Sequence, residues 1–98
     1  YAGDLAKAIV KILPQISEST KGIYHFTNEG VCSWYDFASE IMEQSNLKCR
    51  VNPIPSSAYP TKANRPFYSV LDKSKIKEVF NINIQHWKKG LEKCLKQF

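Results

Sequence analysis

The sequence predicts a small α/β fold of about four helices and two or three short strands. Two observations support this prediction. Apolar residues recur at helical spacing in four segments, and short runs rich in aromatic and β-branched residues lie between them. A chain of 98 residues has room for one domain, which would bury about two thirds of its unfolded surface. We therefore predict a single domain over residues 1–98, with no internal repeat.

Each expected helix has a recognisable start or stop. Asp4 is the expected N-cap of the first helix, which Pro14 should end. Ser33 and Asp36 approximate a capping box for the second helix, in which the serine side chain accepts from a free amide of the first turn. Asp72 is the expected cap of the third helix. The four helices are expected over residues 5–14, 33–45, 72–80 and 87–98.

Three short segments have the composition of strands or extended pieces. They are residues 22–27, 50–54 and 69–71. Asn28, Glu29 and Gly30 follow the first of them and are typical of a turn. The apolar faces of the helices, including Trp34 on the second and Cys94 on the last, are expected to form the core. Stacking of Trp34 on a base is the alternative to its place in the core.

Charge and cysteine content limit the function classes. The net charge of +5 comes mostly from lysines on the last two expected helices, which we interpret as solvated faces; they lack the interleaved aromatics of a nucleic-acid site. Apolar runs are too short for a membrane helix. Three cysteines without a paired spacing indicate a reduced, cytoplasmic setting, and nothing has the spacing of a metal site.

The segment from Tyr59 to Asp72 is the best candidate for a ligand loop. Pro60 and Pro66 fix φ at their own positions and favour extended backbone at the residue before each. The side chain of Arg65 therefore leaves a stiffened backbone. A guanidinium held in this way can bind two phosphate oxygens at once.

The order of several motifs resembles the C-terminal part of the dTDP-4-dehydrorhamnose reductase family of extended short-chain dehydrogenases. The motifs are Asp4-Leu5-Ala6, Tyr24-His25-Phe26-Thr27-Asn28-Glu29-Gly30, Ser33-Trp34-Tyr35-Asp36-Phe37-Ala38, Arg65-Pro66-x-x-Ser69-x-Leu71-Asp72 and the helix at Trp87. Together they span nearly the whole chain. The resemblance implies the substrate-binding C-terminal portion of a Rossmann-type reductase, whose cofactor domain is absent from this chain and is expected upstream.

The resemblance also implies roles for particular residues and ligands. Arg65 would contact the diphosphate of a dTDP-sugar, and Asn28, Tyr59 and Ser69 are further candidates for substrate binding. For Asn28 the turn role, through an interaction with its own backbone, is the favoured alternative. The intact enzyme would reduce dTDP-4-dehydro-L-rhamnose with NADPH, or alternatively NADH. No cofactor or metal is expected on this chain.

The sequence lacks the residues that hydride transfer requires in this family. Gly3, Gly22, Gly30 and Gly90 do not form the G-x-G-x-x-G fingerprint, and no tyrosine has a lysine four residues later. His25 and Cys32 lack a third, orienting group, so we predict no catalytic residue.

Two alternatives remain open. The chain could be a non-catalytic regulatory module of the same fold, or part of another sugar-nucleotide reductase or epimerase. We expect surfaces that would face the cofactor domain to be open, which favours self-association.

Overall fold

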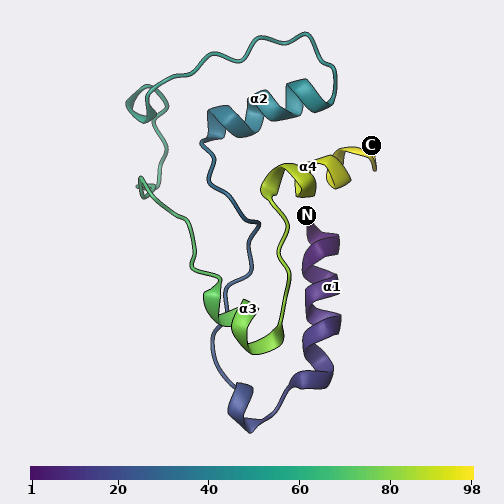
Figure 1. Cartoon of the computed structure of the whole chain (residues 1–98). Coiled ribbons are helices and arrows are strands. Elements are labelled where there is room, and N and C mark those ends of the chain that lie inside the picture. The colour runs from purple at the N-terminus through teal and green to yellow at the C-terminus, as the bar shows by residue number, and fades with distance from the viewer. The chain divides into compact units, whose positions relative to one another are not determined.

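The computed structural model describes all 98 residues and contains four α-helices (Figure 1). The helices are α1 (Ala2–Ile12), α2 (Trp34–Gln44), α3 (Ser74–Phe80) and α4 (Trp87–Leu95). Short 3₁₀ turns lie at Leu13–Gln15, Glu18–Thr20 and Ser56–Ala58. The prediction of about four helices is confirmed. The chain divides into unit 1 (Tyr1–Gly30 with Leu71–Phe98) and unit 2 (Val31–Val70), which are described separately; the single domain stays a prediction.

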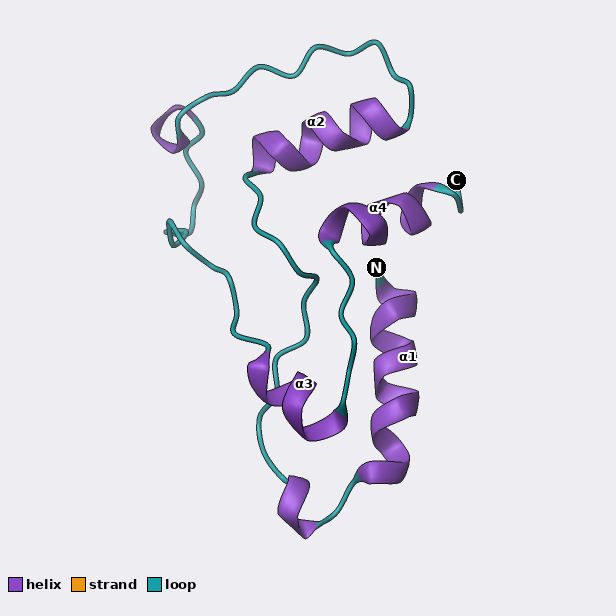
Figure 2. Ribbon diagram, in the orientation of Figure 1, coloured by secondary structure: helices purple, strands orange, loops and turns teal.

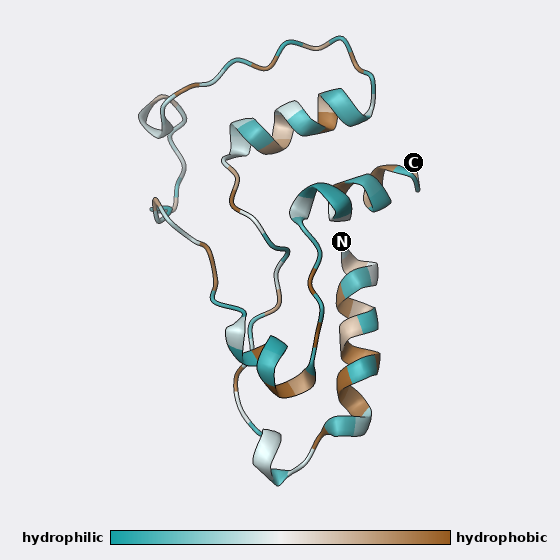
Figure 3. Ribbon diagram, viewed as in Figure 1, coloured by the Kyte–Doolittle hydropathy of each residue, from teal (hydrophilic) through white to brown (hydrophobic).

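The start of α1 differs from the prediction. The N-cap is Tyr1, so Asp4 lies inside the first turn, where a carboxylate still complements the helix dipole. The helix ends at Ile12, and Pro14 belongs to the following 3₁₀ turn, as its missing amide requires. Ala8 is buried, whereas Leu5 and Ile9 are about half exposed. Hydrophobic and hydrophilic residues alternate along α1 (Figure 3). Part of the apolar stripe of α1 is therefore open, and self-association stays a prediction.

The core of unit 1 forms around α3 and the segment that follows it. Ile76 and Phe80 of α3 are buried together with Ile82 and Ile84. Ile12, Tyr24 and Phe26 pack against this cluster. The rings of Tyr24 and Phe80 lie 5.0 Å apart at a tilt of 59°. Residues from three separate stretches of unit 1 thus share one core.

No strand forms, so the strands predicted over residues 22–27, 50–54 and 69–71 are not confirmed (Figure 2). Residues 24–28 and 82–85 do alternate between more and less exposed side chains, as strands do. Directly after these stretches, Glu29 and His86 form a single parallel bridge, in which the Glu29 backbone pairs with Gln85 and Trp87. One bridge is too little for a ladder. Of the three predicted strands, only residues 22–27 supply side chains that pack against the core, namely Tyr24 and Phe26.

The capping box predicted in unit 2 is confirmed. The Ser33 hydroxyl accepts from the Asp36 amide at 3.1 Å, and the Asp36 carboxylate accepts from the Ser33 amide at 2.8 Å. The core position predicted for Trp34 is wrong, because its side chain is 88% exposed. Trp34 is the first residue of α2 and meets the edge of Phe37, with ring centroids 6.4 Å apart.

The predicted ends of the last two helices need correction. The N-cap of α3 is Lys73, but the Asp72 carboxylate accepts from the Ser74 amide at 2.9 Å and so performs the capping. Because α4 ends at Leu95, Phe98 lies beyond its stripe and is fully exposed. Cys94 is only partly buried. None of the helices combines the length and the apolar character needed to span a membrane.

Candidate ligand-binding site

Unit 2 carries three of the four predicted substrate-binding residues on one open segment. Residues 52–70 are all exposed, and the segment holds the 3₁₀ turn Ser56–Ala58 and a bond from the Thr61 hydroxyl to the Ala63 carbonyl. Tyr59 follows the turn with φ −125° and ψ 77°, and its side chain is 71% exposed. The structure thus places Tyr59, Arg65 and Ser69 in the same loop.

The Arg65 guanidinium has no hydrogen-bond or ion-pair partner within the chain. Arg65 therefore takes part in no surface ion pair. Five donors remain free for an external acceptor, and a planar fork suits the oxygens of a phosphate. Phe67 and Tyr68 of the same loop are also exposed, which leaves aromatic faces open for stacking on a flat ligand.

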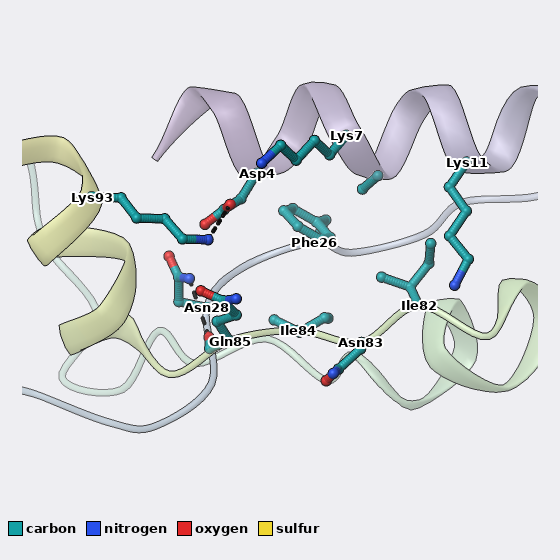
Figure 4. Close-up of a pocket in the computed structure, with 11 residues that line it drawn as sticks. Asp4, Lys7, Lys11, Phe26, Asn28, Ile82, Asn83, Ile84, Gln85 and Lys93 are labelled. Atoms are coloured by element: carbon teal, nitrogen blue, oxygen red, sulfur yellow. Dashed lines mark hydrogen bonds and ion pairs between the residues drawn. The ribbon is translucent and has the colours of Figure 1, made fainter. Parts of the chain in front are cut away.

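Asn28 belongs to unit 1, and its side chain does not hold its own turn. Its Nδ2 donates to the Gln85 carbonyl at 3.1 Å, which links two segments 57 residues apart (Figure 4). Gly90 of α4 lies directly against the amide: a Cβ at that position would stand 3.0 Å from Asn28 Nδ2. The sequence favoured a turn role for the Asn28 side chain, but the structure shows that this side chain links two distant segments.

Glu29 fixes the same stretch more firmly, which the sequence analysis missed. Its carboxylate lies 2.6 Å from Lys77 Nζ and 3.5 Å from Lys73 Nζ. The pKa of Glu29 lies below its usual value mainly because of the hydrogen bond from Lys77. Desolvation opposes this shift in part, and the charge of Lys73 adds to it. Lys73 was assigned to a solvated face, yet it is buried.

Gly30 turns the chain after this anchored stretch. Its φ of +88° lies in the region that favours glycine. A Cβ there would overlap the His86 ring and stand 2.9 Å from Trp87 Cδ1. The close approach to the start of α4 therefore requires glycine, and the predicted turn chemistry at Gly30 is confirmed.

The structure offers no support for a nucleophile or a metal. Desolvation, followed by the charge of Asp36, raises the pKa of the exposed Cys32 thiol, which disfavours the nucleophilic thiolate. No group of three or more His, Cys, Asp or Glu side chains is placed to hold an ion. The charged donor that the predicted site leaves open to an external acceptor is the Arg65 guanidinium.

Comparison with known proteins places the whole chain in one family. The profile described as "RmlD substrate binding domain" matches residues 1–98. The chain is 39% identical over 97 residues to the spore coat polysaccharide biosynthesis protein SpsK of Bacillus subtilis, covering 99% of this chain and 32% of SpsK. No solved structure gives a significant match.

Relatives named dTDP-4-dehydrorhamnose reductase match over a similar stretch. The protein of Aggregatibacter actinomycetemcomitans is 40% identical over 102 residues, covering 94% of this chain and 34% of the relative. That of Escherichia coli K12 is 30% identical over 82 residues, covering 78% of this chain and 27% of the relative. The chain spans about a third of the length of the curated relatives it matches.

Proposed function

The chain belongs to the RmlD substrate binding domain family, and we propose that it forms the substrate-binding part of a dTDP-4-dehydrorhamnose reductase. The observation that carries this proposal is the match of the family profile to all 98 residues, together with reductases up to 40% identical. The substrate is then dTDP-4-dehydro-L-rhamnose, the product is dTDP-L-rhamnose, and the setting is cytoplasmic. The similarity to a spore coat polysaccharide protein supports a role in making cell-surface polysaccharide.

The residues of this chain do not fit a nicotinamide cofactor. Its four glycines do not form a dinucleotide fingerprint, and no Tyr-x-x-x-Lys pair is present. NADPH and the proton donor therefore belong to a Rossmann domain elsewhere in the longer protein. The contribution of this chain is to hold the sugar nucleotide so that its carbonyl meets the hydride donor in a reactive geometry. On its own it is expected to be inactive.

In this proposal Arg65 binds the diphosphate. The support is its position in an open loop with every guanidinium donor free, beside Tyr59 and Ser69, whose hydroxyls also lack partners within the chain. These hydroxyls can donate to phosphate or sugar oxygens. Asn28 contributes through the polar atoms that its bond to Gln85 leaves free.

Titration with dTDP tests the proposal. We expect localised NMR shifts at residues 59–69, and weakening of binding by about 10- to 100-fold in Arg65→Ala, since one charge-assisted hydrogen bond contributes roughly 1.5–3 kcal/mol. Arg50→Ala is the matched control, because it removes the only other arginine of the chain. Arg65→Lys keeps the charge without the fork and should recover only part of the affinity.

The same variants in the longer reductase give the decisive readout. Arg65→Ala should raise KM for the sugar nucleotide at least several-fold, while Arg50→Ala should leave it unchanged. Equal KM values for both variants would remove Arg65 from the site. If Arg65→Ala abolished dTDP binding but the longer reductase kept its full turnover, the assignment of this loop to the nucleotide would be contradicted.

A further inference from the structure

The loop that holds Arg65 also presents aromatic rings that are largely uncovered. After α2, residues 45–70 of unit 2 form a loop with one short 3₁₀ turn (Figure 2). Tyr59 and Tyr68 are 71% and 72% exposed, and Phe67 is fully exposed. None of these three rings contacts another ring or a cation of the chain. The rings are therefore free to meet an external partner.

Phe67 differs from the other two rings because its side chain has no polar atom. The hydroxyl of a tyrosine can bond to water, whereas a phenylalanine ring is stabilised only when an apolar or flat surface covers it. The chain has one other fully exposed phenylalanine, Phe98, which is the last residue and lies beyond α4. Phe67 lies inside the predicted ligand loop, two positions after Arg65. Its exposure therefore coincides with the proposed site.

The charge of the loop indicates what kind of molecule could cover the ring. Residues 45–70 include Lys48, Arg50, Lys62 and Arg65 and contain no Asp or Glu. Lys62, like Arg65, has no hydrogen-bond or ion-pair partner within the chain. The loop thus offers free cations beside an uncovered ring, and it favours a ligand that carries an anion and a flat ring together. A nucleotide has both groups.

The spacing of Arg65 and Phe67 also fits a nucleotide. Two residues of extended chain span at most about 7 Å, so the guanidinium and the ring can contact neighbouring parts of one molecule. In a nucleoside diphosphate, a single deoxyribose joins the base to the phosphates, which makes them such neighbours. Pro66 lies between the two residues and fixes its own φ, so less conformational freedom is lost on binding.

We propose that Phe67 stacks on the base of the sugar nucleotide while Arg65 binds its diphosphate. The inference rests on the proposed function, since Arg65 is what brings the nucleotide to this loop. Every base has a flat face, so stacking on Phe67 favours a nucleotide over free pyrophosphate without selecting one base. Phe67 is thus a binding residue that makes affinity depend on the presence of the base.

Kinetics of the longer reductase test the inference. Phe67→Ala should raise KM for the sugar nucleotide by about 5- to 100-fold, the range expected for the loss of one stacked base, with kcat unchanged. Phe98→Ala is the matched control, because it removes the other fully exposed phenylalanine. Neither variant empties the core, so both should fold. Phe67→Trp keeps a flat ring and should keep KM, whereas Phe67→Leu keeps only apolar bulk and should recover only part of the affinity.

Two competitive inhibitors, dTDP and pyrophosphate, separate the base from the phosphates. Phe67→Ala should weaken inhibition by dTDP about as much as it raises KM and should leave inhibition by pyrophosphate unchanged. Arg65→Ala should weaken both inhibitors, because both carry the diphosphate.

The outcomes distinguish this inference from the proposed function. If Phe67→Ala matched Phe98→Ala while Arg65→Ala raised KM, the inference would be overturned and the proposed function would stand. If Arg65→Ala and Phe67→Ala both left KM unchanged, the nucleotide would not bind this loop, and both would be overturned. Weaker inhibition by the product dTDP-L-rhamnose with unchanged inhibition by dTDP would place the ring on the sugar, which also overturns the inference.

Discussion

The contact between Gly90 and Asn28 can be tested by a double-mutant cycle. In the interior of a helix, alanine is favoured over glycine by about 1 kcal/mol, so helix propensity by itself favours alanine at position 90 of α4. A Cβ at residue 90 would however stand 3.0 Å from Asn28 Nδ2 and 3.2 Å from Oδ1. The amide must then move, and its bond to the Gln85 carbonyl, with a net contribution of roughly 0.5–1.5 kcal/mol, is strained or lost.

The two effects oppose one another only when Asn28 is present. We expect Gly90→Ala to be neutral or destabilising in the natural background, and to stabilise by up to about 1 kcal/mol in the Asn28→Ala background, where the crowding is gone. The coupling energy should therefore be about 1 kcal/mol. Urea unfolding of the four proteins, followed by far-UV circular dichroism, measures each free energy of unfolding. A coupling below about 0.3 kcal/mol, the level of ordinary additivity, would refute this packing.

Three further predictions test the core, the cap and the acid response. Phe80→Ala removes a side chain that is only 2% exposed and should lower the free energy of unfolding by about 3–5 kcal/mol. The neighbouring variant Val79→Ala, at a site 41% exposed, should lower it far less. Similar losses for both variants in urea unfolding would contradict the assigned core. Ser33→Ala should lower the free energy of unfolding by about 1 kcal/mol and speed amide hydrogen exchange in the first turn of α2. Unchanged exchange rates would count against the capping box. The lowered pKa of Glu29 means that its ion pairs stabilise the fold above the ordinary pKa of 4.5 and lose this contribution as pH falls through the folded-state value. Glu29→Gln should accordingly flatten the acid side of the stability profile, and a profile identical to that of the natural chain would exclude the pair.

Features set by residues close in sequence could be predicted. The capping box of α2 needs only Ser33 and Asp36, and the stop of α1 needs only Pro14, so both follow from local chemistry. The start of α1 was missed because Asp4 is a good cap by type, whereas its carboxylate is engaged by Lys93 from the far end of the chain. Local pattern contains no information about a partner so distant.

Burial depends on what lies across an element, and here prediction was less successful. The spacing of Trp34 is that of a core residue, but its ring packs edge-to-face with Phe37 of the same helix and stays 88% exposed. The opposite error occurred at Lys73, whose charge suggested an exposed side chain. It is buried, and Glu29, 44 residues earlier, supplies a partly exposed counter-charge. The predicted strands did not form a ladder, because pairing needs a neighbour in register and only one bridge is present.

The part that Asn28 can take in binding is limited by the bond it already makes. An asparagine side chain has two N–H donors and one carbonyl oxygen. One N–H already donates to the Gln85 carbonyl. Gly90 packs so closely against the amide that a Cβ at residue 90 would stand 3.0 Å from Asn28 Nδ2. A ligand can therefore meet only the second N–H or the remaining capacity of Oδ1, so contact with Asn28 sets the orientation of a ligand more than its affinity. Most of the binding free energy must then come from groups without partners within the chain, among which Arg65 is the one proposed for the nucleotide.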